Sequence, residues 1–348
     1  MHLVQLWPPL ISFFLTLLGI FCMRRVFPKL RLMDRPHEYG IDRKPIPYSG
    51  GIIFFIVFFI TTLIFVDITK PIAGVIFAGL LITFTSFMDD RLRLSPVFRL
   101  GVQILAGIIV VLAGVKIQLV NNPFGAPIFL DRIQLTLLGQ HIWLFSALVM
   151  IAWLVLMMNV MNWLDGIPGL ASGISTIAQL SLFFLSTTQF HIVDQSAVIT
   201  ISTVLAASTF AFLFFDFPPP KILMGDTGSM FLGFMLGVLS ILAGGKLATA
   251  LLIMGFPVLD AFWVILKRLL RRQSPFKGDF SHFHHRLLHG GFSQRPALFF
   301  NYILCAVFAF IALVLHSTFE KFVAFGGILL LMAITGLVLF FREKVLTK

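Results

Sequence analysis

The aspartates of this sequence gather at the edges of long apolar runs, where an isolated surface charge is hardest to place. The positions concerned are Asp89 and Asp90, Asp165, Asp226, and Asp260. A carboxylate at a membrane boundary is costly unless it meets water, a cation or a partner. If these side chains converge on one side of a helix bundle, they form an anionic pocket whose oxygen ligands suit a hard divalent cation.

The adjacent pair Asp89 and Asp90 has a chemistry of its own. Two neighbouring carboxylates repel each other, so one of them holds its proton more tightly unless a cation intervenes. One carboxylate could then act as a base while the other binds metal or is paired. The alternative is a helix-end cluster in which the pair forms salt bridges with Arg91, Arg93 and Arg99.

A second polar segment, 159–173, contains no Lys or Arg. Asn159 and Asn162 are three residues apart and share one face if the preceding apolar run is a helix. Asp165 follows at the same spacing, so amide and carboxylate oxygens could line one cation or nucleotide site. The alternative is a helix-end capping segment closed by Gly166.

Gly225 to Ser229 precede another apolar run and contain Asp226. The glycines allow backbone to approach a phosphate, and the N-terminus of a helix favours anions. The alternative is that Asp226 only caps the following helix. The segment is not a P-loop, because no Gly-Lys-Ser/Thr follows.

Histidines are dense in a third polar segment, which holds His282, His284, His285 and Arg286. Imidazole and guanidinium donors there could bind a pyrophosphate. A zinc site and a solvated charge run are the alternatives, although no cysteine lies nearby. Lys44 stands in a basic loop that could face the same site.

These residues must be positioned by membrane-spanning helices, because 58% of the chain is hydrophobic and only 12% is charged. Soluble domains are closer to 45–50% and 25%, respectively. A span requires about 20 mostly apolar residues. We expect an all-α polytopic membrane protein forming one domain over 1–348, with about eleven spans near 4–23, 51–66, 71–88, 100–115, 142–158, 174–190, 197–215, 229–244, 248–266, 298–315 and 322–341.

The basic residues predict the orientation of these spans. With the N-terminus outside, 21 of the 26 Lys and Arg residues fall in the segments that would face the cytoplasm, which are 24–50, 89–99, 159–173, 216–228, 267–297 and 342–348. Such a bias marks cytoplasmic loops. We therefore expect a cytoplasmic C-terminus and cytoplasmic polar loops, and we attribute the net charge of +11 to topology and not to nucleic-acid binding.

The segment 116–141 interrupts the helical pattern. Apolar residues alternate on both sides of a Pro/Gly-containing stretch, which is typical of two short strands joined by a turn. We expect a small external β-hairpin near 117–137.

Together these segments resemble the polyprenyl-phosphate N-acetylhexosamine-1-phosphate transferase family. Its bacterial members start the assembly of O-antigen, enterobacterial common antigen and teichoic acid. The matching segments occur in family order: DRPHEYGIDRKPIPYSGG at 34–51, MDDRLRLSP at 88–96, NVMNWLDGIPGL at 159–170, MGDTGS at 224–229, PVLD at 257–260 and SHFHHRLLHGGFS at 281–293. One departure is Pro168, which stands where the family usually has a second Asp and puts that residue's role in doubt.

The resemblance implies a bacterial inner-membrane enzyme that transfers a sugar-1-phosphate from a UDP-sugar to polyprenyl (undecaprenyl) phosphate. The products are polyprenyl-diphospho-sugar and UMP, the start of a cell-surface polysaccharide or cell-wall polymer. The form of the histidine segment resembles the subgroup that uses sugar nucleotides such as UDP-N-acetylglucosamine. The resemblance also implies Mg²⁺, for which Mn²⁺ could substitute, and leaves a homodimer open.

The resemblance assigns roles to the candidate residues. Asp226 is the expected metal ligand, with Asn162 assisting. Asp89 would deprotonate or orient the lipid phosphate beside Asp90, and Asp165 is the third catalytic candidate. The remaining candidates would bind the nucleotide, pyrophosphate or sugar: Asn159, Asn162, Arg93, Lys44, His282, His284, His285 and Arg286.

A transporter or flippase of a phosphorylated or lipid-linked substrate is the alternative class. It predicts ionisable residues near the middle of the bilayer along a pathway. In this sequence the ionisable residues stand at the ends of the apolar runs, which favours the enzyme. A CDP-alcohol phosphotransferase is disfavoured because its aspartate-rich signature is absent.

Overall fold

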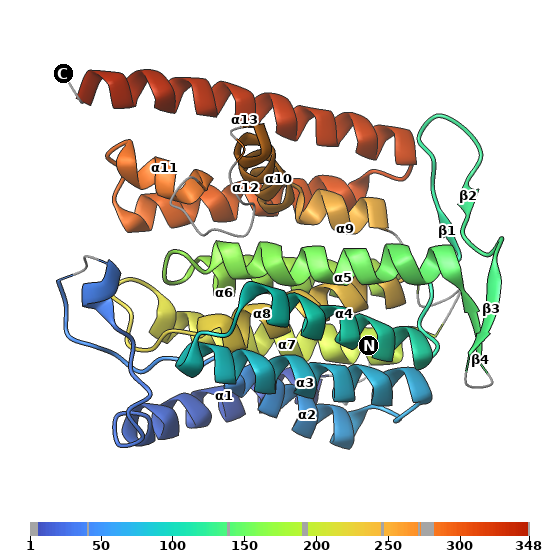
Figure 1. The fold of residues 1–348 in the computed structure, drawn as a ribbon, viewed down its shortest axis with the longest axis horizontal. Helices are drawn as coiled ribbons and strands as arrows, with labels where there is room; N and C mark the ends of the chain where they lie inside the picture. The colour runs from blue at the N-terminus through green and yellow to red at the C-terminus, as the bar shows by residue number, and fades with distance from the viewer. Residues whose placement is uncertain are drawn as a thin grey trace.

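The protein is a bundle of long helices with four short strands at one end (Figure 1). The computed structural model describes residues 6–39, 42–137, 140–189, 194–244, 247–270, 272 and 282–346. The helices are α1 (Trp7–Val26), the 3₁₀ turn η2 (Pro36–Tyr39), α2 (Ile52–Phe65), α3 (Lys70–Leu92), α4 (Pro96–Leu112), α5 (Leu144–Leu164), α6 (Leu170–Gln189), α7 (Ser196–Asp216), α8 (Gly225–Leu242), α9 (Leu247–Ile253), α10 (Gly255–Leu270), α11 (Phe283–His289), α12 (Gln294–Val314) and α13 (Thr318–Leu346).

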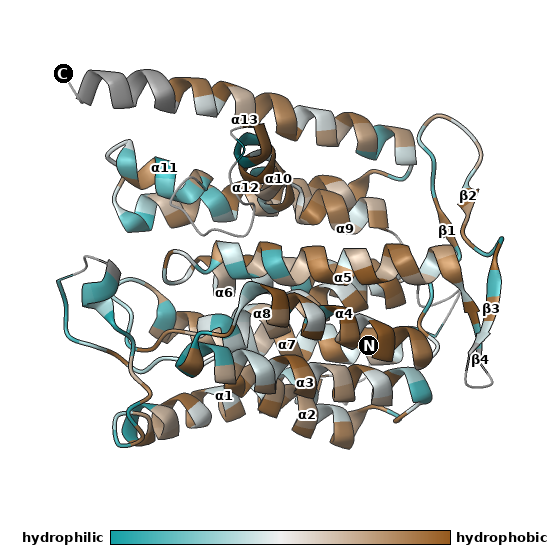
Figure 2. Cartoon of the chain, in the orientation of Figure 1, coloured by the Kyte–Doolittle hydropathy of each residue, from teal (hydrophilic) through white to brown (hydrophobic). Residues whose placement is uncertain are grey.

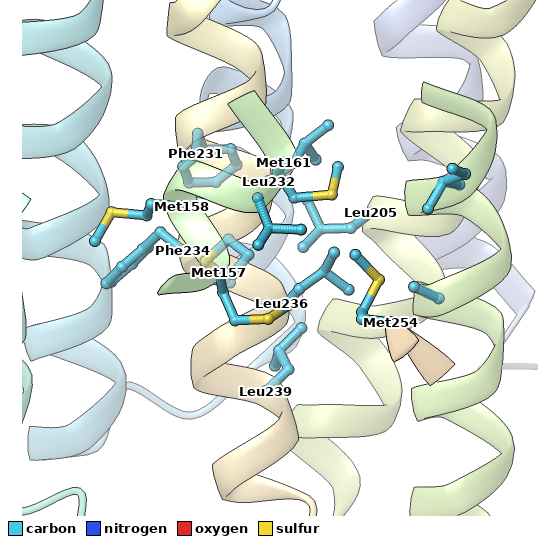
Figure 3. Packing of buried hydrophobic residues seen from close by; sticks show 14 of the residues in the cluster. Met157, Met158, Met161, Leu205, Phe231, Leu232, Phe234, Leu236, Leu239 and Met254 are labelled. Atoms are coloured by element: carbon cyan, nitrogen blue, oxygen red, sulfur yellow. The ribbon is translucent and has the colours of Figure 1, made fainter. Parts of the chain in front are cut away.

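Helix α8 lies at the centre of the bundle. In its apolar stretch 89% of the residues are buried, against 6% for α13. Figure 3 shows Phe231, Leu232 and Phe234 of α8 among the methionines of α5. Gly233 permits this approach, since a Cβ there would lie 2.5 Å from the Met157 carbonyl oxygen. Small residues at such contacts let membrane helices pack closely, so α8 is a fixed support for whatever its first turn carries.

The prediction of a polytopic, mostly helical membrane protein is confirmed in its coarse form. Among the described residues, eight helices are long and apolar enough to cross a membrane, and nine if the bent pair α9–α10 is one span. Helices α2 and α4 are apolar but shorter. Figure 2 shows hydrophobic residues along the helices and hydrophilic residues gathered towards the end that carries α11.

The expected single span at 248–266 is instead two helices, α9 and α10, bent by 82° at Met254. Pro257 explains the break, because a proline lacks the N–H of an interior helical bond and clashes with the carbonyl four residues earlier. Figure 1 shows α10 nearly end-on, across the direction of the neighbouring helices. The bend turns Asp260 of α10 away from the path of a straight span.

The hairpin expected near 117–137 is present in a shorter form, and a second small antiparallel sheet follows it. Strand β1 (Leu119–Val120) pairs with β2 (Ile128–Phe129), and β3 (Gln134–Leu137) pairs with β4 (Gln140–Trp143). Because β3 and β4 are close in sequence, closing the loop between them costs little conformational entropy. The alternating apolar residues at 133–137, which the sequence pattern assigned to the second strand of one long hairpin, therefore belong to a separate hairpin formed by β3 and β4.

At the opposite end of the bundle, the segment before α2 is hydrogen-bonded to the segment before α8. The Leu223 N–H donates to the Pro47 carbonyl, Gly50 donates to Leu223, and Gly51 donates to the Met224 carbonyl, each at 2.9 Å. The two segments almost touch, because a Cβ on Gly51 would lie 2.2 Å from the Cα of Gly228. This contact places the 47–51 segment beside the first turn of α8.

Candidate active site

The first turn of α8 receives its cap from another helix. Asp90, at the end of α3, accepts the backbone N–H of Asp226 at 2.9 Å and the Thr227 hydroxyl at 2.6 Å. The Ser49 side chain also hydrogen-bonds to Asp90. Carboxylates are favourable at helix N-termini, where N–H groups lack partners. Capping is therefore done by Asp90, and Asp226 makes no side-chain cap.

Because Asp90 caps the helix, Asp226 is free to face the neighbouring helices. Its Oδ1 accepts the Asn162 amide at 2.9 Å, and its Oδ2 accepts Nη1 of Arg99 at 3.1 Å. The same Nη1 lies 2.9 Å from Oδ2 of Asp89, whose other oxygen accepts the Leu94 N–H at 2.6 Å. Of the carboxylates expected to converge, Asp89, Asp90 and Asp226 do so here, with Asn162 and Arg99 among them, whereas Asp260 contacts His282 and Phe283 instead.

Asp165 and Asp216 extend this carboxylate cluster, the name used here for Asp89, Asp90, Asp165, Asp216 and Asp226. Asp165, half-buried just after α5, has a pKa raised well above its ordinary value by burial first and then by the charges of Asp216, Asp226 and Asp90. Asp216 accepts the Gly169 N–H at 2.9 Å and the Ser172 hydroxyl at 2.8 Å. The cluster thus concentrates carboxyl groups around Arg99, the one guanidinium that bridges two of them in the described part of the chain.

The histidine segment, residues 282–286, is held by Asp260 of α10. One Asp260 oxygen lies 2.9 Å from His282 Nδ1, and the other accepts the Phe283 N–H at 2.9 Å. Trp163 stacks on His282, with ring centroids 5.8 Å apart. Residues 273–281, which precede the segment, lie outside the part of the chain that the structure describes.

The histidine segment meets the loop that carries Asp165. A Cβ on Gly166 would lie 2.7 Å from His284 Nε2 and 2.8 Å from His285 Nε2, so both imidazoles reach that backbone. His284 is buried and its Nε2 has no hydrogen-bond partner. Burial lowers the pKa of His284 well below its ordinary value, and His285 and His282 lower it further. His284 is therefore neutral at physiological pH.

Three predicted substrate-binding residues make contacts elsewhere, and a fourth is exposed. Asn159 donates to the Gln103 side chain at 2.9 Å on α4. Arg93 pairs with Glu38, and Lys44 is exposed in the loop before α2. Arg286 donates to the Gly336 carbonyl of α13 at 3.0 Å, whereas the neighbouring His284 and His285 lie against Gly166.

Three residues gain importance that their sequence context alone did not give them. In the sequence, Arg99 is one of several arginines that follow Asp89. Ser95 caps α4 and Pro96 is its first residue, so the helix begins there and turns Arg99 back towards Asp89. Asp260 stands near the end of an apolar run. Its partner, His282, could not be identified from the sequence because the contact depends on the bend at Met254. Asp216 carried no motif signal beyond its place at the end of a run.

The donor set fits a hard divalent cation in kind. Carboxylate and amide oxygens surround the start of α8, and the buried Oδ1 of Asp216 has no hydrogen-bond partner. Mg²⁺ and Mn²⁺ prefer such ligands. In the arrangement seen, however, no three His, Cys, Asp or Glu side chains of the described chain converge as a ready-made metal site. The oxygens of Asp226 are engaged by Arg99 and Asn162 instead.

Comparison with known proteins gives a consistent family. The sequence profile of glycosyl transferase family 4 matches residues 72–244. The chain is 30% identical to the decaprenyl-phosphate N-acetylglucosaminephosphotransferase of Mycobacterium leprae, over 88% of this chain and 82% of the relative. It is 29% identical to a probable undecaprenyl-phosphate N-acetylglucosaminyl 1-phosphate transferase of Bacillus subtilis, over 94% and 92%.

A third relative is the undecaprenyl-phosphate alpha-N-acetylglucosaminyl 1-phosphate transferase of Escherichia coli K12, 28% identical over 89% of this chain and 83% of the relative. These matches span nearly the whole chain, including the carboxylate cluster and the histidine segment. The chain belongs to glycosyl transferase family 4, together with the polyprenyl-phosphate N-acetylglucosamine 1-phosphate transferases.

Proposed function

We propose that this enzyme transfers N-acetylhexosamine 1-phosphate from a UDP-sugar to undecaprenyl phosphate, giving undecaprenyl-diphospho-sugar and UMP. The observation that carries the proposal is the carboxylate cluster at one end of a membrane bundle, next to a histidine segment that faces the same loop. The names of the relatives support both the sugar phosphate and the polyprenyl phosphate acceptor.

A small cavity beside the cluster suits the lipid acceptor. It lies between α3, α4 and α8, and it is lined by Ile82, Ser86, Asp89, Arg99, Val102 and Met230. Thr85 and Gln103 complete the lining, so charged, polar and apolar side chains all border the cavity, which suits the junction between a phosphate and a hydrocarbon chain. Asp89, which lines this cavity, would orient the lipid phosphate or hold its proton.

The reaction is a phosphoryl transfer in which alignment and charge neutralisation dominate. An oxygen of the lipid phosphate attacks the phosphorus that bears the sugar. The bond from that phosphorus to the UMP oxygen breaks, and UMP leaves with the electron pair. A bound Mg²⁺ would neutralise the pyrophosphate charge. Asp226 would hold that ion, with Asn162 beside it.

The histidine segment would bind the sugar nucleotide from the water side. His282 is oriented by Asp260, and His284 and His285 lie against Gly166 in the loop that follows α5. Imidazole N–H groups would donate hydrogen bonds to phosphate or sugar oxygens. Lys44, Arg93 and Arg286 would approach the nucleotide only by leaving the positions described above.

The decisive assay is UMP release from UDP-sugars by membranes with and without added undecaprenyl phosphate. We expect release that depends on the lipid and is fastest with UDP-N-acetylglucosamine. Lipid-independent transport of the UDP-sugar, with no UMP formed, would instead support a transporter.

The distribution of basic residues further supports a cytoplasmic membrane protein whose polar loops face the cytoplasm. On this proposal, a tag at the N-terminus or between β1 and β2 is accessible from outside, and a C-terminal tag only from inside. External accessibility of the C-terminal tag in intact cells would contradict the orientation.

A further inference from the structure

Arg99 occupies the centre of the site in an unusual way. A single nitrogen, Nη1, serves Asp89 at 2.9 Å and Asp226 at 3.1 Å. An arginine that binds one carboxylate with two nitrogens forms a stronger and more specific pair. Here Asp89 and Asp226 share one nitrogen of Arg99. The guanidinium therefore neutralises both carboxylates but binds neither of them with two nitrogens.

The position of Arg99 on its own helix is also unfavourable. It stands in the first turn of α4, which begins at Pro96 after the Ser95 cap. The helix dipole disfavours a cation at this end. The guanidinium is therefore held by the two carboxylates and not by its helix, and it is 31% exposed, which leaves it room to turn.

A divalent cation and Arg99 would compete for the same oxygen atoms. Asp226 has both oxygens engaged, and the one facing Asp89 is engaged by Arg99. Two positive centres at one carboxylate pair repel each other, and a doubly charged ion attracts the pair more strongly. Binding of the ion therefore requires the guanidinium to move off Asp226.

The guanidinium already borders the cavity between α3, α4 and α8, which has room for about one water molecule, so turning towards it also requires the lining side chains to move. Arg99 and Asp89 already line it, and its other walls include Ile82, Val102 and Met230. A guanidinium released into this space meets no further cation among the lining residues. It would be placed to bind a phosphate whose apolar chain extends along the apolar side chains of the lining.

We propose that Arg99 is an exchangeable internal cation: it neutralises Asp89 and Asp226 until a divalent cation binds, and it then turns to hold the phosphate of the lipid acceptor. This inference rests on the proposed function. It gives metal binding and lipid-phosphate binding a defined coupling, in which each favours the other.

The first experiment measures Mn²⁺ binding to the purified enzyme by electron paramagnetic resonance, without substrate. A charge-assisted hydrogen bond contributes about 1.5–3 kcal/mol, so Arg99→Gln should bind Mn²⁺ about tenfold or more tightly than wild type. Arg99→Lys should lie between them. Arg91→Gln is the matched control, since Arg91 is an exposed residue in the last turn of α3. Unchanged or weaker Mn²⁺ binding by Arg99→Gln would overturn the exchange.

Thermal unfolding separates exchange from misfolding. Arg99→Gln should unfold at a lower temperature than wild type without metal and should gain more from added Mn²⁺. A folded variant with the same gain as wild type contradicts the proposal. Where Arg99→Gln does not fold, Arg99→Lys provides the same comparison, because it keeps a charge but not the shared geometry.

The second experiment measures farnesyl phosphate binding with and without saturating Mn²⁺. We expect Mn²⁺ to tighten binding in wild type several-fold and in Arg99→Gln hardly at all. Inorganic phosphate distinguishes a free anion from a lipid headgroup: equal tightening for both would contradict a site that uses the apolar side chains of the cavity lining. Metal-independent farnesyl phosphate binding in wild type would contradict the release of Arg99.

These outcomes are separable from the proposed function. An active wild type whose Arg99→Gln variant binds Mn²⁺ no better leaves the transferase proposal intact and removes the exchange. A wild type that releases no UMP from any UDP-sugar removes the function, whatever the Mn²⁺ measurements show.

Discussion

The carboxylate cluster and the histidine segment lie close together but are built differently. The cluster is assembled from the ends of helices that are packed into the bundle, and backbone groups of α8 bind Asp90 directly. The histidine segment lies on α11, a short helix of seven residues, and is anchored chiefly by Asp260 and by stacking on Trp163. On the proposed function, the two regions divide the work: the cluster acts on the metal ion and the lipid phosphate, and the histidine segment binds the soluble sugar nucleotide.

The largest effect should come from removing the charge of Asp226. Asp226→Asn should abolish turnover, because loss of an outer-shell partner of a metal alone already costs about 10–100-fold. Excess chelator should do the same to wild type. UMP release with titrated Mg²⁺ or Mn²⁺ checks this, with Asp67→Asn, an exposed position at a loop away from the cluster, as control. Full turnover in chelator would remove the metal from the site.

Asp89→Asn tests whether the cluster acts on the lipid. Turnover should fall about 10²–10⁴-fold, the usual contribution of a general base, with little change in UDP-sugar affinity. Calorimetric titration of UDP-sugar into the purified variant separates the two. If Asp89→Asn loses nucleotide binding while the histidine-segment variants keep it, the division of labour is reversed.

Gly51→Ala tests the framework of the cluster without altering a charge. The new Cβ would lie 2.5 Å from the backbone nitrogen of Gly228 and 2.9 Å from the Met224 carbonyl oxygen. Overpacking of this kind costs about 1–3 kcal/mol. We expect a lower unfolding temperature in detergent than for Gly101→Ala, where a Cβ meets nothing within 4 Å. Equal unfolding temperatures would show that the backbone around Gly51 and Gly228 can move apart without loss of stability.

Asp260→Asn tests the anchor of the histidine segment. The UDP-sugar KM should rise about tenfold while kcat changes little, because a hydrogen bond to a charged group contributes about 1.5–3 kcal/mol and the amide preserves part of it. His289→Gln, at an exposed position of the same helix, should have no such effect. A large fall in kcat at unchanged KM would move Asp260 to the chemical step.

Arg286→Ala should have the smallest effect, a rise of about fivefold in the UDP-sugar KM, as expected for loss of about 1 kcal/mol. Arg286→Lys should restore only part, since a point charge cannot reproduce the planar donors. Nucleotide titrations of both variants check this. Unaltered affinity in Arg286→Ala would assign this arginine to its contact with Gly336 alone.

The sequence allowed the membrane class and every residue of the cluster except Asp216 to be predicted, because both follow from where charge stands relative to apolar runs. Asp89, Asp90, Asn162 and Asp226 do converge. What the pattern could not predict is the direction in which each side chain points once the helices pack. Asn159 shares a helix with Asn162, yet its amide reaches Gln103 on α4.

The remaining differences have the same origin in tertiary packing. The bend at Met254 brings Asp260 to His282, and hydropathy does not register a change of direction within an apolar run. Arg286 carries the motif signal of an anion-binding residue, but its nearest acceptor is a carbonyl of α13, far away in sequence. Arg99 had no signal stronger than that of its neighbours until α3 and α4 were placed side by side.

The capping of α8 by Asp90 has a consequence for biogenesis. The helix that presents Asp226 lacks a cap from its own segment and borrows one from a residue 136 positions earlier. During membrane insertion, the first N–H groups of α8 remain without this partner until α3 has docked against it. A chain in which α3 has not docked would therefore fail to order the first turn of α8. The site that contains Asp226 then forms only when the helices have assembled correctly.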